Sequence, residues 1–538
     1  MAERVADTIG RALRAAGIRF AFGMPGGEVV TLVDGLERAG IRFVLARHET
    51  AAAMMAAGAA VSDDAPGLLV TTLGPGLANA VNGIADAAQE RVPLLVLSGV
   101  VERAVRSRYT HQIVDHAALL RPLVKASFEI EPEGAAATVR RALALANTPP
   151  CGPVHLDLSP AVAAMPSAEI DPILAAPARP PAGIDPQGAA ARALRDALAQ
   201  ARRPLLVAGF EAARGDAREA VMALAEGWGV PVVTTYKAKG LIDEDHPAAL
   251  GAAGLSPLAD KILLGLAAES DLIILAGYDP IEMRAGWLDP FPASARIVEL
   301  GTLPADHGMH AAALRLEGPV AALLSAGMAG LRERRTWAEG QPARARQALR
   351  QAFAAPRSWG PHAAFETLQA SLPADATVTI DSGAHRILLS QMLRLKRPLS
   401  VLQSAGWCTM GAAVPLAIGA KIAAPARPVV AVLGDGGLEM GLGELGTLRD
   451  QRLPVVVLVL QDESLALIAL KQSQAGLPAA GVGLGATRFD LVAEAFGGRG
   501  VTVSDRTSLE AALREAFAAD RFTVIACRIE AGAYVGRF

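Results

Sequence analysis

The chain has 538 residues, of which 52% are hydrophobic, 20% are charged and 4% are aromatic. At about 100–200 residues per domain, this length predicts two to four domains, and the composition excludes a disordered chain. The net charge of −3 comes without a long run of either sign. We therefore expect neither a nucleic-acid partner nor a polybasic membrane patch.

The three cysteines, Cys151, Cys408 and Cys527, are widely spaced and form no Cys-x-x-Cys pair. This pattern supports neither a disulfide framework nor a zinc site. The longest strongly apolar runs, such as residues 454–460, are far shorter than the roughly 18–20 residues that cross a bilayer. Because no signal-peptide core is visible either, we expect a cytoplasmic protein without a membrane-spanning segment.

The first part of the chain alternates short apolar runs with helical segments. The apolar runs cover residues 43–46, 67–72 and 93–98, and we take the first of them as the first strand. Helices are expected over about 49–61 and, after the second run, up to residue 89. Apolar strands that alternate with helices are typical of a parallel sheet covered on both faces. We therefore expect an α/β domain over residues 1–165.

Two more α/β domains are expected after a linker rich in proline and alanine, residues 164–186. The second domain covers residues 187–330, with strands at 204–208, 231–234, 272–275 and 296–299. The third covers residues 360–538, with strands near 378, 401, 429–433, 455–460, 502 and 524–527. The charged stretch 332–350 is expected to be a solvated connecting helix. The predicted fold class is α/β, with three doubly wound parallel-sheet domains.

Two acidic residues follow neighbouring strands of the third domain. The strand 429–433 ends in Gly434-Asp435-Gly436-Gly437, a helix is expected from Met440 to about residue 450, and the next strand ends in Gln461-Asp462-Glu463-Ser464. Adjacent parallel strands deliver Asp435 and Asp462 to one edge of the sheet, where such sheets bind ligands. Two carboxylates and a carbonyl suit Mg²⁺, and the glycines allow a phosphate to approach the backbone. The alternative is an ordinary strand-to-helix turn with a capping aspartate.

The first domain carries two further candidate segments. Glu49 opens a helix whose next residues are almost all alanine, methionine and glycine. A carboxyl group in such surroundings can exchange a proton near neutral pH, although a glutamate there also complements the helix dipole. Residues 71–79 contain a Gly-Pro-Gly turn that places Asn79 one turn into the following helix, which is also compatible with an ordinary turn.

In this order the segments resemble the thiamine-diphosphate (ThDP) enzymes of the acetolactate synthase and pyruvate decarboxylase superfamily, over essentially the whole chain. The signature is a Gly-Asp-Gly followed by an Asn-Asn-like pair, and 25 residues separate Gly436 from Asp462 here. The turn at residues 22–27, the Gly-Pro-Gly-x-x-Asn at 74–79 and the stretch 404–411 also resemble family motifs.

The resemblance implies a role for each of these segments. Glu49 would hydrogen-bond the aminopyrimidine of ThDP and so activate the cofactor. The activated cofactor would attack a 2-oxo acid, and an enamine would remain once CO₂ departs. Met410 would hold the bent cofactor, and backbone groups near Gly406 and Cys408 would contact the pyrimidine. Asp435, Asp462 and the Ser464 carbonyl would bind Mg²⁺. Further cofactor contacts are expected from Pro25, Gly26, Thr72, Gly76, Asn79, Gly383, Ala384, His385, Gly434, Gly436, Gly437 and Leu465.

The resemblance also implies that the first domain binds the pyrimidine and the third the diphosphate, across an interface between two chains. A homodimer or homotetramer is therefore expected. FAD is a possible further component, but it is not favoured. The central domain has Gly251-Ala252-Ala253-Gly254 and residues 277–280 in place of flavin-contact patterns.

Several positions depart from the synthase pattern. Asp462 replaces the usual metal-binding asparagine, and Lys471 takes the place of a tryptophan that shapes the acceptor pocket. Lys471 is either a contact to an anionic substrate group or a solvated helix residue. His111 stands where the synthases have phenylalanine, before Gln112, and both are expected in the catalytic pocket. Glu28 is a weaker candidate for the same pocket.

The leading functional prediction is decarboxylation of a small 2-oxo acid with carboligation, as in acetolactate synthase. Because a histidine near the reacting carbon can donate a proton, a decarboxylase that releases an aldehyde is the first alternative. A ThDP-fold protein that binds without catalysis is the alternative from another class, and the presence of Glu49 argues against it.

Overall fold

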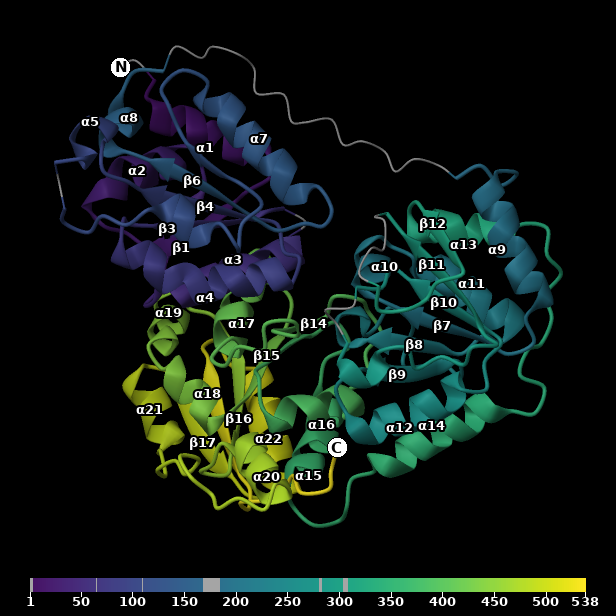
Figure 1. Cartoon of the computed structure of the whole chain (residues 1–538). Coiled ribbons are helices and arrows are strands. Elements are labelled where there is room, and N and C mark those ends of the chain that lie inside the picture. Colours follow the sequence, from purple (N-terminus) through teal and green to yellow (C-terminus); the bar gives the residue numbers. More distant parts are fainter. Residues whose placement is uncertain (1–2, 64, 109, 168–183, 280–282, 303–307) are drawn as a thin grey trace.

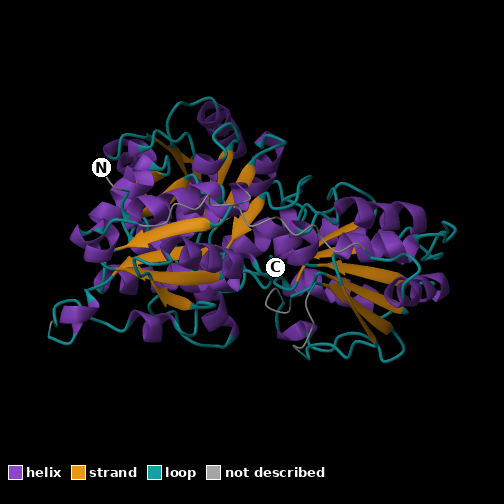
Figure 2. Ribbon diagram, turned by 90° about the horizontal axis from the view of Figure 1, so that it is seen from above, coloured by secondary structure: helices purple, strands orange, loops and turns teal. Residues whose placement is uncertain are grey.

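The computed structural model describes residues 3–63, 65–108, 110–167, 184–279, 283–302 and 308–538. It contains three six-stranded sheets, each with helices on both faces (Figures 1 and 2). Every strand pair in the three sheets is parallel, so the predicted fold class is confirmed. Most of the predicted linker, residues 168–183, lies outside the described residues.

The first sheet has the strand order β2-β1-β3-β4-β6-β5. Its elements are α1 Val5–Ala15, β1 Phe20–Met24, η1 Gly27–Val29, α2 Val30–Arg38, β2 Arg42–Leu45, α3 Glu49–Asp63, β3 Gly67–Thr71, α4 Pro75–Gln89, β4 Leu94–Gly99, α5 Arg103–Arg106, α6 His116–Leu120, β5 Ser127–Glu129, α7 Ala135–Asn147, β6 Pro153–Leu158 and α8 Pro160–Ala164. The register pairs Gly23 with Leu45 and Met24 with Thr71, so the segments that follow β1, β2 and β3 leave the sheet at one edge.

The central sheet has the order β12-β11-β10-β7-β8-β9. Its elements are α9 Ala189–Gln200, β7 Pro204–Ala208, α10 Phe210–Arg214, α11 Arg218–Trp228, β8 Val232–Thr235, η2 Tyr236–Ala238, β9 Ala249–Ala253, α12 Pro257–Ala267, β10 Leu272–Ala276, η4 Ala285–Trp287, β11 Arg296–Gly301, β12 Leu314–Glu317, α13 Val320–Met328 and α14 Gln341–Ala352. The order reverses once, between β7 and β10, as in doubly wound folds.

The third sheet has the order β14-β13-β15-β16-β18-β17, the same arrangement as the first. Its elements are α15 Pro361–Ser371, β13 Thr377–Ile380, α16 Ala384–Met392, β14 Val401–Gln403, α17 Ala413–Ala423, β15 Val429–Gly434, α18 Asp435–Met440, α19 Glu444–Asp450, β16 Val456–Gln461, α20 Ala466–Gln474, α21 Phe489–Ala495, β17 Arg499–Val503, α22 Arg506–Phe517 and β18 Thr523–Arg528. β15 and β16 run in register from Val430–Val456 to Gly434–Leu460, and they end side by side.

Helices α3 and α17 join the first domain to the third (Figure 1). All eleven residues of α17 are buried, which is typical of a helix enclosed on every side. A Cβ on Gly58 would collide with the Leu416 carbonyl, and one on Gly419 with the Met55 carbonyl. Gly58 of α3 and Gly419 of α17 thus allow the two helix backbones to approach closely.

Three predicted boundaries are wrong. Residues 43–46 are not the first strand, because β1 precedes them. The sequence of β1 has the pattern of a turn, since it contains Gly23 and is followed by Pro-Gly-Gly. The helix expected over 332–350 begins only at Gln341. The helix expected from Met440 begins at Asp435, and the glycine-rich residues 441–443 divide it into α18 and α19.

No helix among the described residues is long and apolar enough to cross a membrane.

Candidate active site

Glu49 lies buried at the first residue of α3. Asn79 on α4 donates a hydrogen bond from Nδ2 to Glu49 Oε2 at 3.1 Å. A Cβ on Gly76 would lie 3.5 Å from Glu49 Oε1 and 2.7 Å from Thr72 Cγ2, so glycine keeps the space beside the carboxylate open. The structure thus brings together four residues that the sequence predicts for the site, and we call them the Glu49 cluster: Glu49, Thr72, Gly76 and Asn79.

The turn after β1 lies against this cluster. Thr72 donates from Oγ1 to Glu28 Oε2 at 2.6 Å. A Cβ on Gly26 would lie 2.7 Å from Thr72 Cβ, which explains why glycine stands there. Pro25 is exposed at the same turn. Glu28, the weaker candidate from the sequence, is therefore in direct contact with Thr72.

A carboxylate of the third domain holds the segment that precedes Glu49. Glu444, which is almost fully buried on α19, accepts hydrogen bonds from Arg47 N at 2.9 Å and His48 N at 3.1 Å. Thr447 Oγ1 donates to its other oxygen at 2.7 Å. Burial raises the pKa of Glu444. Sequence reasoning misses Glu444. In the sequence, the only sign of this residue is an acidic side chain among apolar residues of a short helix.

Gln112 and His116 contact the turn that begins α4. Gly74 has φ +56°, and a Cβ there would collide with the Gln112 carbonyl. Gly74 N donates to His116 Nε2 at 3.3 Å, while His116 Nδ1 lies 2.7 Å from Asp157 Oδ1. Gln112 and His116 also line a cavity of about 380 Å³. His111 lies on the exposed loop just before Gln112.

The structure places two of the three predicted metal ligands, Asp435 and Asp462, at the adjacent ends of β15 and β16. Asp435 accepts hydrogen bonds from Gly436 N at 2.9 Å and Glu463 N at 2.7 Å. Asp462 is buried, and among the described residues its Oδ2 has no hydrogen-bond partner. Burial and the negative charge of Asp435 raise the pKa of Asp462 to about 7, and burial also raises that of Asp435. A divalent cation fits this pair, because it would satisfy the free oxygen and offset the repulsion.

Glycines at the start of α18 form a narrow cradle next to this pair. A Cβ on Gly436 would lie 3.2 Å from a methyl group of Leu465 and 3.7 Å from Met410 Cε. A Cβ on Gly437 would collide with the Asp381 carboxylate. Met410 and Leu465, both predicted from the sequence, therefore approach the Gly-Asp-Gly turn, and the cradle suits a cofactor that contacts the backbone closely. Ser464 follows on the same loop and pairs with Gly483.

The segment after β13 completes this edge. His385 is buried on the first turn of α16, and its Nδ1 would lie 3.5 Å from a Cβ on Gly434. His385 Nε2 has no hydrogen-bond partner in the part of the chain that the structure describes, and burial lowers the pKa of the ring to about 3. A neutral imidazole with an unsatisfied nitrogen is therefore available beside Gly383, Ala384 and Gly434.

One face of α4 holds the loop that carries Met410. Asn82, Asp86 and Glu90 are spaced four residues apart, so they lie on the same side of the helix. Asn82 Nδ2 donates to Thr409 Oγ1 at 2.9 Å, and Asp86 Oδ1 accepts from Ser404 Oγ at 2.5 Å.

The third of these residues also reaches the central domain. Glu90 Oε1 accepts from Gly406 N at 2.6 Å, and its Oε2 lies 3.1 Å from Lys237 Nζ. Burial and the nearby charge of Glu90 raise the pKa of Asp86 to about 7. The exposed Cys408, which receives a hydrogen bond from Arg386 at 3.2 Å, lies on the same loop. All three domains therefore meet at the predicted pyrimidine-contact loop.

Asp381 anchors the other end of that loop. Its carboxylate accepts hydrogen bonds from Gly411 N at 2.9 Å and Ala412 N at 3.0 Å. Complete burial raises its pKa to about 6. Asp381, Asp86 and Glu90 are not found by sequence reasoning, since their partners lie tens to hundreds of residues away in the chain.

The predicted residues therefore form two groups. The first is the Glu49 cluster, and the second, which we call the Asp435 cluster, comprises Met410, Asp435, Gly436 and Asp462. Among the residues that the structure describes, no hydrogen bond joins the two clusters.

Comparison with known families assigns a model to each of the three domains. Residues 3–119 match the N-terminal TPP binding domain of thiamine pyrophosphate enzymes, residues 191–326 match their central domain, and residues 381–527 match their C-terminal TPP binding domain.

Curated relatives align over most of the chain. A probable acetolactate synthase large subunit of Methanocaldococcus jannaschii is 31% identical, covering 86% of this chain and 81% of its own. A probable 2-ketoarginine decarboxylase of Pseudomonas aeruginosa is 32% identical, with 96% and 92% covered. A catabolic acetolactate synthase of Raoultella terrigena is 30% identical, with 98% and 95% covered.

Proposed function

The chain belongs to the thiamine pyrophosphate (ThDP) enzymes, and from this premise we propose that it decarboxylates a small 2-oxo acid with Mg²⁺ and joins the product to an acceptor carbonyl. The observation that carries the proposal is the buried Glu49 at the start of α3, held by Asn79 within the N-terminal TPP binding domain. When bound, ThDP supplies a carbon nucleophile and an electron sink for the departing CO₂.

Asp435 and Asp462 would hold the Mg²⁺, together with the Ser464 carbonyl. The free, buried Oδ2 of Asp462 and the mutual repulsion of the two carboxyl groups support this assignment. Gly436 and Gly437 leave the backbone accessible to a diphosphate beside the ion. Met410 and Leu465 cover the same turn with apolar atoms, which limits the access of water.

Glu49 would take up and return a proton at its carboxylate. The Asn79 amide fixes one oxygen, Oε2, and Gly76 leaves room in front of the other, Oε1. Because Glu444 holds the two backbone amides that precede Glu49, the carboxylate has little freedom to turn away. A proton-transfer group is effective only when it is positioned in this way.

The alternative outcome, release of an aldehyde, is supported by a different observation. One relative is named a probable 2-ketoarginine decarboxylase, and His111 stands next to Gln112 at the turn that begins α4. A histidine there would protonate the product carbon in place of a second carbonyl compound. His111 and Gln112 are thus proposed to choose between the two reactions, with Lys471 as a contact for an anionic group of the substrate.

We also propose that the site forms between two chains of a homodimer or homotetramer. The absence of a hydrogen bond between the Glu49 and Asp435 clusters, among the described residues, supports this arrangement. Two large apolar side chains on the segments that carry the second cluster are exposed in the single chain: Met440, at the end of α18, is 66% exposed, and Trp407, on the loop that leads to Met410, is 44% exposed. A second copy would cover them. The cytoplasmic location stays a prediction, and FAD stays possible but not favoured.

Product analysis by NMR tests the proposal. The purified chain is supplied with ThDP, Mg²⁺ and pyruvate, and then with a panel of longer and more acidic 2-oxo acids. A carboligated hydroxy-keto product is expected, and an aldehyde with CO₂ would establish the alternative. ThDP binding without turnover of any donor would contradict both and support a protein that only binds the cofactor.

A further inference from the structure

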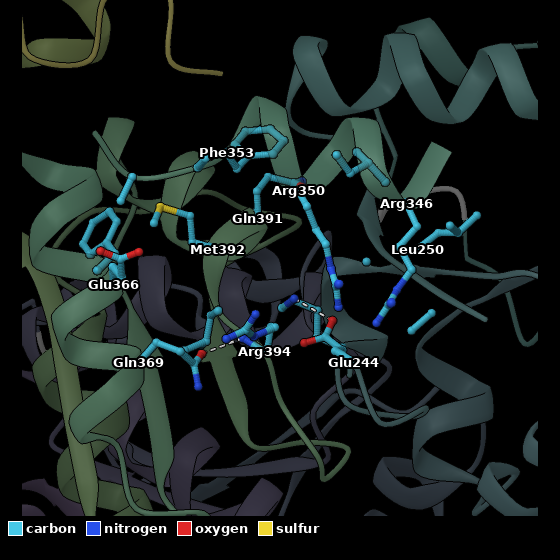
Figure 3. A pocket seen from close by; sticks show the side chains of 18 of the residues that line it. Glu244, Leu250, Arg346, Arg350, Phe353, Glu366, Gln369, Gln391, Met392 and Arg394 are labelled. Atoms are coloured by element: carbon cyan, nitrogen blue, oxygen red, sulfur yellow. Dashed lines mark hydrogen bonds and ion pairs between the residues drawn. The ribbon is translucent and has the colours of Figure 1, made fainter. Parts of the chain in front are cut away.

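A second cavity, of about 540 Å³, lies between the central and third domains. Its walls come from the segment before and within β9, from α14 and the residues after it, from α15 and from the end of α16 (Figure 3). None of its lining residues belongs to the candidate active site. Its volume is in the range of sites that hold small organic ligands.

The wall of this cavity carries an excess of positive charge. Arg346 and Arg350 are one turn apart on α14, and Figure 3 shows their guanidinium groups pointing the same way into the cavity. Arg394 lies across from them. Burial and the charges of Arg350 and Arg394 lower the pKa of Arg346. Like charges at this helical spacing repel each other, so an anion placed between them would be stabilising.

The two acidic residues that line the cavity, Glu244 and Glu366, are bound to groups other than these arginines. Glu244 is buried and accepts from Lys239 Nζ at 2.7 Å and from Leu395 N at 2.8 Å. Glu366 is paired with Arg506 at 2.5 Å.

The arginines themselves have few partners. Within the described ranges, Arg346 donates only to the backbone carbonyl of Asp245, and Arg394 lies 3.5 Å from the Asp245 carboxylate. Arg350 has no hydrogen bond or ion pair within the described part of the chain. Two guanidinium groups of α14 therefore remain available to a ligand.

The remaining wall is apolar. Leu349, Phe353 and Phe365 are buried side chains that line the cavity, and Leu250 and Met392 contribute to it from the two domains. Charged forks beside an apolar wall suit a molecule with anionic groups on a carbon skeleton, since an inorganic ion would leave the apolar wall without contacts.

We propose that this cavity binds an organic polyanion, a small molecule whose phosphate or carboxylate groups pair with Arg346, Arg350 and Arg394. Such a ligand would contact both α14 and α16, and it would therefore link the central domain to the third. This binding does not depend on which reaction the active site catalyses.

Isothermal titration of the holoenzyme tests the proposal. Saturating ThDP and Mg²⁺ occupy the active site, and the probes are ADP, citrate and adenosine at matched free Mg²⁺ and 150 mM salt. Saturable binding of ADP or citrate, one per chain, with no binding of adenosine is expected. A preference for ADP would identify phosphate as the recognised group, and a preference for citrate would identify carboxylate. Because a ligand that bridges two domains stabilises the folded chain, the melting temperature should rise with the bound probe.

Variants of α14 provide the decisive control. The double variant Arg346→Gln and Arg350→Gln should weaken binding at least about tenfold, since each arginine contributes a charge-assisted hydrogen bond. Arg344→Gln, an exposed arginine of the same helix that donates to the Glu339 carbonyl, should bind as the unmodified chain does. Binding that survives the double variant, that Arg344→Gln weakens equally, or that is undetectable for both anions would overturn the proposal.

Discussion

At the scale of single residues, Asp462 is the most informative departure from the family pattern. Its free oxygen and its proximity to Asp435 fit a cation, but a second full negative charge lies where the anionic diphosphate would bind. An amide oxygen would still coordinate the ion and would remove that charge. The substitution Asp462→Asn therefore separates the coordination of the ion from the effect of the extra negative charge.

We expect Asp462→Asn to keep its activity and to bind ThDP at least as tightly as the unmodified chain. The measurement is a ThDP titration at fixed Mg²⁺, followed by tryptophan fluorescence, together with the turnover rate. Glu463→Gln is the matched control, because it removes a neighbouring acid whose side chain points to Arg528. A complete loss of ThDP binding in Asp462→Asn would show that Asp462 is wrongly assigned as the metal-binding residue.

Glu49 allows a sharper test of catalysis. Glu49→Gln keeps the size of the side chain and its bond from Asn79, but removes the proton acceptor. We expect turnover to fall by about 10²–10⁴-fold while ThDP binding changes little. Glu102→Gln changes an acid at the N-cap of α5 that makes no capping hydrogen bond to the described residues, and it should leave turnover unchanged. Undiminished activity in Glu49→Gln would remove its assignment as the catalytic group.

The sequence predicts Asp435 and Asp462 and misses Glu444 and Asp381 for a physical reason. Asp435 and Asp462 belong to one local pattern, two strand ends separated by a helix, which can be recognised without a structure. Glu444 acts on amides 396 and 397 residues away, and Asp381 on amides 30 and 31 residues away. Nothing near a buried carboxylate in the sequence indicates which distant backbone it will meet.

At the scale of elements, α4 connects the Glu49 cluster to the Met410 loop of the same chain. Its first turn carries Gly76 and Asn79, which contact Glu49, and its later turns hold the loop around Met410 through Asn82, Asp86 and Glu90. This role is not visible in the sequence, because the helix shows only the usual amphipathic spacing.

Removing one contact of α4 should loosen the loop without affecting Glu49. Glu90→Ala deprives Gly406 N of its acceptor and leaves the buried Lys237 without its partner. We expect an increase of about tenfold in the Kd for ThDP, with kcat at saturating ThDP nearly unchanged, and a stability loss of about 3 kcal/mol. Glu90→Gln, which keeps an oxygen acceptor, should recover most of the ThDP affinity. A fall in kcat with an unchanged Kd would contradict a positioning role.

Asp86, whose carboxylate bonds Ser404 of the same loop, makes the stability of the chain depend on pH. Because its folded pKa is raised from 3.8 to about 7, the folded chain retains a proton that the unfolded chain loses between these values. The stability that Asp86 contributes is thus greatest below about pH 4 and falls as the pH rises to about 7. Asp86→Asn still accepts from Ser404, so its melting temperature should gain on the unmodified chain between pH 5 and 7 and then stay parallel. A constant difference over this range, measured by circular dichroism, would contradict the expectation.

The elements themselves were predictable to different degrees. The uniformly apolar strands, such as β15 and β16, stand out because both faces of their sheet are covered. β1 does not, since Gly23 interrupts it and a Pro-Gly-Gly turn follows. The charged residues 332–340 lack helical structure, although their composition suits a helix, because Arg334 and Thr336 bond backbone carbonyls of the central domain.

At the scale of the whole molecule, the first and third sheets share one strand order and the central sheet has another. The sequence predicts three α/β domains from the alternation of strands and helices, but it carries no signal for strand order within a sheet. The shared order places the Glu49 cluster and the Asp435 cluster at equivalent sheet edges. Each chain thus carries one Glu49 cluster and one Asp435 cluster, which are the two half-sites of the proposed active site.

A complementation experiment decides whether the half-sites combine within or between chains. Glu49→Gln and Asp435→Ala should each be inactive alone, since each lacks one half-site. In a mixed dimer, the intact Glu49 of one chain would meet the intact Asp435 of the other, which restores one of the two sites. Co-expressed chains that assort randomly should therefore recover about a quarter of the unmodified activity. The recovered activity should elute with the dimer or tetramer in size-exclusion chromatography and should be lost on dilution to the monomer. If co-expression restores nothing although mixed dimers are isolated by two affinity tags, each site forms within one chain and the proposed interface is wrong.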